Sequence, residues 1–279
     1  MRITVVGSIN LDFVATAPHL PRAGETVTGA TLARHPGGKG ANQALAAQRL
    51  GADVCMIGRV GRDAMAEEAM TLLLADDVDV GGVLADTEAA TGVALIAVDP
   101  KGENQIVVAA GANHRAFPEQ LPQRIECPLI LQLELPIETV EAAVGRATDF
   151  VCVNLAPAQP VSDQLLRRAD LLIVNETEAA FYGDLLHHGG GRVVVTKGAR
   201  GAAMYQRGVE MAWATPPKVT AVDATGAGDC FVAAICVALL EGKDPAEALR
   251  FACAAGAIAA TRPGAQPSMP TRDEVEALL

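Results

Sequence analysis

Short runs of apolar residues alternate with amphipathic stretches along most of the chain. The apolar runs are three to five residues long and mostly lack polar alternation, which is typical of strands buried on both faces. They are Ile3–Val6, Val54–Ile57, Leu129–Leu133, Phe150–Val153, Leu171–Val174 and Val193–Val195. Between them the pattern predicts helices at Ala41–Leu50, Ala64–Leu74, Thr139–Arg146, Asp163–Arg168 and Thr177–His187. This β-α-β-α order predicts an α/β protein with a mostly parallel sheet covered by helices on both sides.

The C-terminal third departs from this rhythm. Two short strands, Ala202–Gln206 and Val209–Trp213, flank an Arg207-Gly208 turn and predict a hairpin. Two helices, Gly228–Leu240 and Pro245–Ala260, are expected to follow the hairpin.

Two further stretches indicate strand pairs with looser alternation. These are Phe13–Thr16 with Glu25–Arg34, and Gly92–Val98 with Asn104–Ala109, bounded by turns rich in Pro and Gly. Because they lie between a parallel strand and its crossover helix, we expect them to project as a small β-lid. The lid would lie within residues 12–35 and 91–110, over the carboxyl ends of the strands, where open α/β sheets bind ligands. The alternative is that they extend the edge of the main sheet.

Composition excludes several classes of protein. Half of the 279 residues are apolar, which argues against disorder. A formal charge of −11, from 22 Lys and Arg against 33 Asp and Glu, argues against a nucleic-acid partner. No apolar stretch of about 18 residues predicts a membrane span, and the first residues form a strand-like run rather than a signal peptide. The cysteines and histidines lack metal-ligand spacing, so a reduced, cytoplasmic protein is expected.

The strongest local signal is Asp223-Ala-Thr-Gly-Ala-Gly-Asp229, which leads into the apolar run Cys230–Leu240. Glycines at a helix start leave several N–H groups pointing outward, and the positive end of the helix dipole makes them an anion site. An acid in such a site is unfavourable for simple phosphate binding. It is understandable if Asp229 takes a proton while the neighbouring amides hold a transferring phosphoryl group. The alternatives are that Asp229 complements the helix dipole and that the glycines allow tight packing.

Two other segments carry side chains suited to a polyhydroxylated ligand. Gly37-Gly38-Lys39-Gly40-Ala41-Asn42 lies at a helix start and lacks the spacing and the Ser or Thr of a Walker P-loop. Its Lys39 can donate hydrogen bonds, and Asn42 can both donate and accept them. Asn10 and Asp12 lie on one face of a strand end and offer paired acceptors. The alternatives are a capping loop with a solvated lysine and a solvated turn.

Two turns that follow buried strands also carry polar side chains. Asn175 and Glu178 are neighbours at a helix start, and an amide with a carboxylate suits Mg²⁺, which keeps several waters. The alternative is a capping box formed by the same two residues. Thr196-Lys-Gly-Ala-Arg-Gly201 joins a strand to the hairpin and could accept parts of a nucleotide, or be a simple turn.

Taken in order, these motifs resemble those of the PfkB family of carbohydrate kinases, and most closely its ribokinase branch. The resemblance runs over nearly the whole chain, and many ordered matches are far more specific than one glycine motif. The matching segments are Gly7–Asp12, Gly24–Gly29, Gly37–Gln43, Thr91–Leu95, Gly111–Asn113, Leu131–Glu134, Asn154–Ala158, Asn175–Ala179, Asp223–Asp229 and Arg262–Ser268.

The resemblance implies a ribokinase-like three-layer α/β/α sandwich with a small β-sheet lid, formed by residues 1–279 as a single kinase domain. It implies ATP-dependent phosphorylation of a free sugar, and the expected reaction converts D-ribose to ribose 5-phosphate. Asp229 would be the base that takes the proton of the 5-hydroxyl. Gly226, Ala227 and Gly228 would form the anion hole. The sugar would be held by Asn10, Asp12, Gly38, Lys39, Asn42, Glu134 and Asp229.

The resemblance also implies a nucleotide site, two ions and a partner chain. ATP would be bound by Asn175, Thr196, Lys197, Gly198, Ala199, Arg200, Gly201, Gly228 and Cys253. Asn175 and Glu178 would organise Mg²⁺, in part through water. K⁺ would be held by Asp223, Thr225, Ala259, Arg262, Gly264 and Ser268. The residues alone leave another possibility, in which Arg262 pairs directly with Asp223. The lid is expected to form a homodimer contact.

The sequence leaves several alternative functions open. They are kinases of 2-keto-3-deoxygluconate, fructose, deoxyribose or a nucleoside, and a catalytically silent sugar-binding regulator. Gly38, Lys39 and Asn42 favour a free pentose, the lid has little besides Phe13 to stack on a base, and an intact Asp229 argues against a silent protein. Cys253 stands where many ribokinases have His or Asn, and the stretch 179–192 is short, so nucleotide preference is left open.

Overall fold

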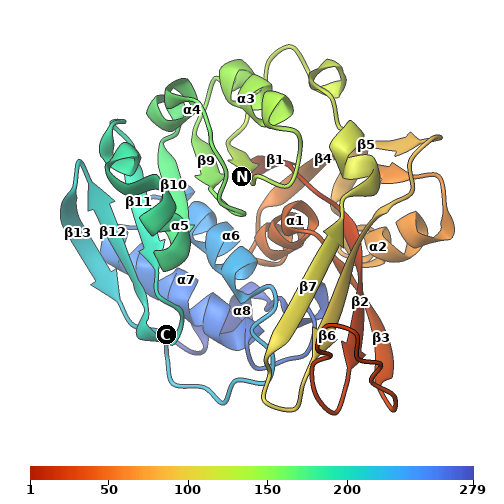
Figure 1. Ribbon diagram of the computed structural model, residues 1–279. Helices are drawn as coiled ribbons and strands as arrows, with labels where there is room; N and C mark the ends of the chain where they lie inside the picture. The colour runs from red at the N-terminus through yellow and green to blue at the C-terminus, as the bar shows by residue number, and fades with distance from the viewer.

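The computed structural model describes all 279 residues and contains a nine-stranded main sheet. Its strands, in the order β13-β12-β11-β10-β9-β8-β1-β4-β5, run parallel except for β12, which is antiparallel to both of its neighbours (Figure 1). The predicted parallel sheet and hairpin are therefore confirmed. The strands are β1 (Arg2–Val6), β4 (Asp53–Gly61), β5 (Asp79–Asp86), β8 (Leu129–Leu131), β9 (Val151–Asn154), β10 (Leu171–Asn175), β11 (Arg192–Thr196), β12 (Ala202–Gln206) and β13 (Val209–Ala214).

Helices cover both faces of this sheet, as the alternating pattern predicts. One layer contains α1 (Lys39–Arg49), α2 (Ala64–Ala75), α6 (Ala227–Leu240), α7 (Pro245–Ala259) and α8 (Arg272–Glu276). The other contains α3 (Ile137–Arg146), α4 (Asp163–Arg168) and α5 (Glu176–Tyr182). Two separate apolar cores, of 46 and 24 buried residues, lie between the sheet and these layers. None of the helices has the length and apolar character needed to span a membrane.

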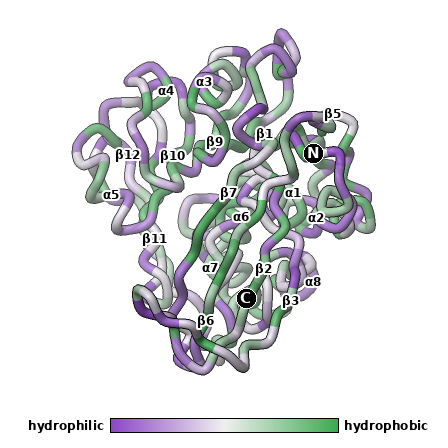
Figure 2. Tube along the Cα trace, turned by 45° about the vertical axis from the view of Figure 1, so that its right-hand side comes forward, coloured by the Kyte–Doolittle hydropathy of each residue, from purple (hydrophilic) through white to green (hydrophobic).

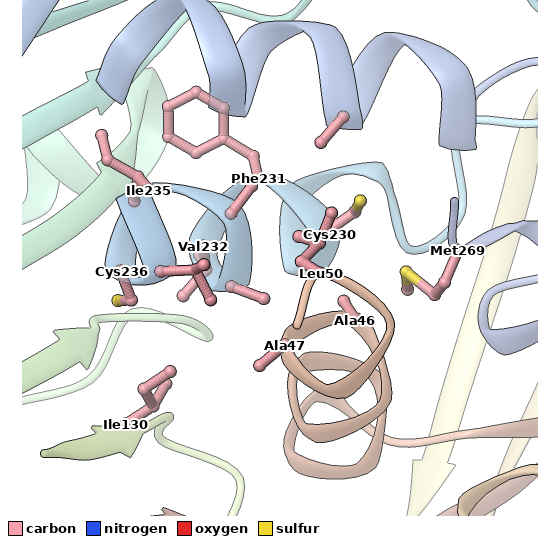
Figure 3. Packing of buried hydrophobic residues seen from close by; sticks show 14 of the residues in the cluster. Ala46, Ala47, Leu50, Ile130, Cys230, Phe231, Val232, Ile235, Cys236 and Met269 are labelled. Carbon is pink, nitrogen blue, oxygen red and sulfur yellow. The ribbon is translucent and has the colours of Figure 1, made fainter. Parts of the chain in front are cut away.

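Helix α6 is deeply enclosed in the fold. Every residue from Cys230 to Ala238 is buried, so the helix is apolar on all sides, as expected for a helix inside a core. Figure 3 shows how α1 packs against it, with the small side chains of Ala46 and Ala47 and the larger one of Leu50 between the two helices. Close packing by alanine and cysteine replaces the aromatic residues that the composition lacks, and it fixes the N-terminus of α6 in place.

A second sheet of four strands, in the order β3-β2-β6-β7, projects from the main body (Figure 1). It consists of β2 (Asn10–Thr16), β3 (Thr31–Gly37), β6 (Gly92–Val98) and β7 (Asn104–Ala109). The predicted small sheet is confirmed, and the alternative of added edge strands is wrong. The prediction of a strand over Glu25–Arg34 is also wrong in its bounds. Gly29 has φ +82° and interrupts extended backbone before Thr31, whereas pairing with β2 extends β3 to Gly37.

Other differences from the predicted elements have local causes. The helix predicted over Thr177–His187 ends at Tyr182, because Gly183 has φ +53°, and a 3-10 turn continues to His187. Strand β5 was not predicted because it is an edge strand with two central glycines and an irregular burial pattern. Helix α8 is only five residues long, too short for its periodicity to be recognised.

Candidate active site

The predicted site residues meet at the carboxyl ends of five neighbouring parallel strands of the main sheet, β11, β10, β9, β8 and β1. This edge is where open α/β sheets bind ligands. Asn154, Asn175 and Thr196 are the last residues of β9, β10 and β11, and Glu134 follows β8. Asn10 and Asp12 lie on β2, the strand that follows β1. The N-termini of α1 and α6 complete the site and bring Lys39, Asn42 and Asp229 to the same place.

Asp229 lies in the first turn of α6 and is 7% exposed. Its Oδ2 accepts a hydrogen bond from Asn42 Nδ2 at 2.8 Å, and its Oδ1 accepts one from Gln43 Nε2 at 2.9 Å. The structure therefore orients this carboxylate through both oxygens. Sequence reasoning placed Asn42 beside the sugar and missed Gln43 altogether.

The start of α6 presents unsatisfied backbone donors beside Asp229. The N–H groups of Gly228 and Asp229 have no hydrogen-bond acceptor within the protein, whereas the N–H of Ala227 donates to the Ala224 carbonyl at 3.2 Å. Gly226 precedes the helix at φ +77°, and a Cβ there would lie 2.9 Å from the backbone of Ala265. Only glycine fits this turn. Among the predicted anion-hole residues, the N–H groups of Gly226 and Gly228 have no acceptor within the protein and remain available to an anion.

Four charged side chains share the region between β2 and α1. Burial raises the pKa of Asp12 to about 7, the carboxylates of Glu134 and Asp229 act in the same direction, and Lys39 opposes them. The same three carboxylates and Glu178 raise the pKa of Lys39, with Asp229 contributing most. Glu134 accepts hydrogen bonds from Ser8 Oγ at 2.5 Å and from the Lys39 backbone N–H at 3.1 Å. The site is thus a buried acidic environment around one lysine.

Asn10 is held by a residue that sequence reasoning left without a role. Its Oδ1 accepts from Asn113 Nδ2 at 2.7 Å, and Asn113 also bonds both backbone groups of Ile9. The other side of this region is formed by glycine backbone. A Cβ on Gly37 would lie 2.2 Å from Asp12 Oδ2, and Gly38 has φ +87°. The backbone at Gly37 therefore lies closer to Asp12 than a residue with a Cβ would allow.

Asn175 and Glu178 form the capping box that was the alternative prediction. Asn175 Oδ1 accepts from the Glu178 N–H at 2.9 Å, and Glu178 Oε2 accepts from the Asn175 N–H at 2.7 Å. Both residues nevertheless line a cavity of about 240 Å³ together with Lys39, Asn154, Thr196 and Asp229. Burial raises the pKa of Glu178, and Lys39 partly offsets this. Capping and a place in the site are therefore compatible.

A second cavity, of about 560 Å³, adjoins the first at Thr196 and Gly228. Of the predicted nucleotide-binding residues, those lining it are Thr196, Gly198, Ala199, Gly201, Gly228 and Cys253. Lys197 and Arg200 do not line it. The Lys197 ammonium lies 4.8 Å from the centre of the Trp213 ring, and Arg200 pairs with Glu176.

Much of the second cavity's wall was not predicted. It includes Phe231 and Gly256, and the loop after β13, from which Pro216, Pro217 and Val219 contribute. This loop has no regular structure between Ala214 and Ala227. Long connections without secondary structure are often functional, so its length was the available signal.

The turns at Asp223 and Gly264 meet, as predicted. Asp223 accepts from the Gly264 N–H at 2.8 Å and from the Thr225 N–H at 2.9 Å. The alternative pairing of Arg262 with Asp223 is wrong, because Arg262 pairs with Glu274, which the capping box at the start of α8 places beside it. Ser268 Oγ donates to the Ala265 carbonyl at 2.7 Å, and the Ala259 carbonyl accepts from the Arg262 N–H.

Comparison with known proteins identifies the family. The sequence model of the pfkB family carbohydrate kinases matches residues 1–272. The chain belongs to this family. As a PfkB carbohydrate kinase it is 39% identical to ribokinase from Bacillus subtilis, over 99% of both chains. Its fold superposes on that of Thermotoga maritima ribokinase with a TM-score of 0.89 at 34% identity, covering 99% of this chain and 98% of the other.

A third relative was solved with ligands. Arabidopsis thaliana ribokinase, whose structure contains ribose and ATP, is 31% identical and superposes with a TM-score of 0.84, covering 99% of this chain and 97% of that one. The PfkB kinase described here has the same ribokinase-like fold, in which a large mostly parallel sheet is joined by a second small sheet.

Proposed function

We propose that this kinase transfers the γ-phosphoryl group of ATP to the 5-hydroxyl of D-ribose. The observation that carries the proposal is the position of Asp229, which lines the 240 Å³ cavity beside unsatisfied amides of α6, one residue from Gly228, where the larger cavity adjoins. On one side lie the buried acceptors Asn10 and Asp12, and on the other the larger cavity, which is lined mostly by backbone and apolar groups. The structure of the Arabidopsis relative with ribose and ATP supports a sugar and a nucleotide as the two substrates.

Asp229 would take the proton of the sugar hydroxyl as the hydroxyl oxygen attacks the phosphoryl group. Phosphoryl transfer passes through a loose transition state, so the protein mainly positions the reactants and stabilises charge. The free N–H groups of Gly228 and Asp229 point from the start of α6 and can bind the transferring group. A well-placed donor of this kind contributes about 2.7–4 kcal/mol to transition-state stabilisation.

The character of the sugar side favours a free pentose. Asn10, Asp12 and Asn42 are buried, and each offers acceptors or donors that sugar hydroxyls can pair with. Asn42 Oδ1 has no hydrogen-bond partner within the protein, which leaves a buried acceptor for a ligand hydroxyl. A nucleoside would need a surface on which its base could stack.

The proposal is tested by measuring ADP release with a panel of acceptors. We expect kcat/KM for D-ribose to exceed that for fructose, 2-keto-3-deoxygluconate, deoxyribose and adenosine by at least ~10-fold, since each missing buried hydrogen bond costs that much. A higher kcat/KM for another acceptor would identify that acceptor as the substrate in place of ribose. Ribose binding without ADP release from ATP would identify a silent regulator.

The residues present fit a hydrated Mg²⁺. One oxygen of Glu178 caps the backbone of Asn175, while the other has no hydrogen bond within the protein, and both residues line the 240 Å³ cavity. Mg²⁺ keeps several waters, so few direct ligands are needed. It would neutralise charge on the nucleotide phosphates. Replacing Glu178 by Gln is expected to raise the Mg²⁺ concentration for half-maximal activity several-fold; an unchanged titration would remove Glu178 from this role.

A monovalent cation fits the joined turns at Asp223 and Gly264. Asp223 bonds two backbone N–H groups, and Arg262 pairs elsewhere, so the carboxylate is not neutralised by a side chain. Backbone carbonyls nearby can complete an oxygen cage of the kind that holds K⁺. We expect activity to rise several-fold when K⁺ replaces Na⁺ at constant ionic strength, because the cation would order the loop that precedes α6. Equal rates in the two salts would reject the site.

The small sheet is proposed to form a homodimer contact. Leu32, Leu95, Ile106, Val107 and Val108 are all more than half exposed on its strands. Figure 2 shows β6 and β7 as apolar segments of the projecting sheet. An exposed apolar patch of this kind marks an interface, and two-fold self-association is the commonest way to cover it.

Light scattering at micromolar concentration is therefore expected to give twice the mass of one chain. The double substitution Leu95→Lys with Val107→Lys should give a monomer, because like charges would meet across the contact. Exposed Val209 on β13 offers the matched control, since Val209→Lys should leave the mass unchanged. A monomeric parent chain would reject the dimer and leave the kinase proposal standing.

A further inference from the structure

Gln43 is a fully buried residue in α1 that joins three other polar side chains. Its Nε2 donates to Asp229 Oδ1 at 2.9 Å and to Asn154 Oδ1 at 3.1 Å. Its Oε1 accepts from Gln132 Nε2 at 2.6 Å. Gln132 is likewise fully buried, and Asn154 is 7% exposed. The four residues come from α1, α6, the end of β9 and the turn after β8, so one network connects both helices of the site to the sheet.

The negative charge of the Asp229 carboxylate determines which group donates and which accepts in every hydrogen bond of this network. An ionised Asp229 can only accept, so Gln43 must turn its amide nitrogen toward it. The Gln43 oxygen then faces Gln132 and must receive that residue's amide nitrogen. Asn154 accepts the second N–H of Gln43 and donates its own to the Ile173 carbonyl at 3.2 Å. Only one arrangement of the three amides satisfies these contacts.

Such a network fixes the orientation of the Asp229 carboxylate. Asn42 holds Oδ2 and Gln43 holds Oδ1, so the carboxylate cannot rotate without breaking a buried hydrogen bond. Misplacement of a reacting group by about 1 Å can lower a rate by about 10²-fold. The charged or ionisable groups that otherwise act on Asp229 are Lys39, Asp12 and Cys230.

We propose that Gln43, supported by Gln132 and Asn154, is a positioning residue that holds Asp229 ready to accept the proton of the substrate hydroxyl. The proposal rests on the proposed role of Asp229 as the base. Gln43 itself is fully enclosed and lines neither of the two described cavities. Its effect should therefore fall on turnover rather than on substrate binding.

The first test compares Gln43→Met with Gln48→Met. Methionine keeps the length and volume of glutamine and removes all three hydrogen bonds of Gln43. We expect kcat to fall about 10- to 100-fold, with KM for ribose and ATP within about 3-fold of the parent enzyme. Gln48 lies on the same helix and bonds only the Val54 N–H, at 3.0 Å, so Gln48→Met should leave kcat unchanged.

The second test is the pH profile of Gln43→Glu, which keeps an acceptor for Gln132 and places a second carboxyl against Asp229. Two carboxyl groups within hydrogen-bond distance share one proton. We expect the acid limb of kcat/KM to move to higher pH by at least about one unit, with activity partly recovered under alkaline conditions. A merely structural role for Gln43 would lower thermal stability and leave the profile of the folded enzyme in place.

The outcomes separate this proposal from the one on which it rests. If Gln43→Met is folded and keeps kcat within twofold of the parent while Asp229→Asn is inactive, the positioning role is overturned and the base remains. If Asp229→Asn retains turnover, the base itself is rejected. Should Gln43→Met fail to fold, Gln132→Met breaks the same network one step away, and a normal kcat and normal pH profile in that variant would overturn the proposal.

Discussion

Replacing Asp229 by Asn is expected to lower kcat at least ~10²-fold, the low end for loss of a general base, while KM for ribose and ATP stays within a few-fold. The substitution preserves shape but removes the proton acceptor. It also sets an amide nitrogen against one of the two donors, Asn42 or Gln43, that now hold the carboxylate. Steady-state kinetics with ADP release as the readout measures the effect, and isothermal titration shows whether both substrates still bind.

The matched control for this substitution is Asp244→Asn. Asp244 also stands at a helix start, where its Oδ1 accepts from the Glu247 N–H at 2.8 Å, but it caps α7 rather than lying in the first turn of α6. Asn caps helices as well as Asp does, so kcat should stay within about twofold of the parent. Near-normal turnover in Asp229→Asn would remove that residue from the mechanism.

Replacing Asp12 by Asn is expected to have two opposite effects, one on the sugar and one on the fold. KM for the sugar should rise at least ~10-fold, because hydrogen bonds to a charged acceptor are worth about 1.5–3 kcal/mol. Stability at pH 8 should rise instead. The pKa of Asp12 is about 7 in the folded chain and 3.8 in a model peptide, so the folded state binds the proton more tightly.

The sign of the pH dependence follows from this difference. Between pH 4 and pH 7 the folded chain holds a proton that the unfolded chain has lost, so the free energy of unfolding falls as the pH rises. The loss at pH 8 is on the order of 4 kcal/mol, since one pKa unit corresponds to about 1.4 kcal/mol. Asp12→Asn removes this slope. Urea unfolding at pH 5 and pH 8 measures it, and an equal stability difference at both values would contradict the raised pKa.

The same titration should be visible in the parent enzyme's affinity for sugar. Below pH 7 Asp12 is largely protonated and presents one acceptor fewer to the hydroxyls. Affinity for ribose is therefore expected to increase from pH 6 to pH 8.

The fold was largely predictable because its strands are short apolar runs in a regular order, whose pattern does not depend on distant contacts. The bounds of β3 could not be predicted, since its last residues are extended only through pairing with β2. Among the site residues, Asp229 and Asn42 stand in recognisable turns. Gln43 does not, because its partners lie 89, 111 and 186 residues away and nothing local marks the contact.

The partner of Arg262 was missed for a related reason. The sequence showed Asp223 and Arg262 in two turns that flank the last two predicted helices, and attraction between opposite charges made their pairing the alternative to a K⁺ site. The choice was decided instead by the short helix α8, which brings Glu274 to the arginine. Part of the wall of the larger cavity was likewise missed, because an irregular loop, whose length was its only signal, contributes to it.

Strand β2 carries site residues on the small sheet, apart from those on the main body. Asn10 and Asp12 belong to the small sheet, and Asn113, which holds Asn10, follows β7 of the same sheet. Thr196 and Gly228, by contrast, belong to the main body. Part of the proposed sugar site therefore comes from the small sheet, whereas the proposed nucleotide site comes from the main body. Under the proposed function, variation in the small sheet can change which sugar is accepted and leave the nucleotide site unchanged.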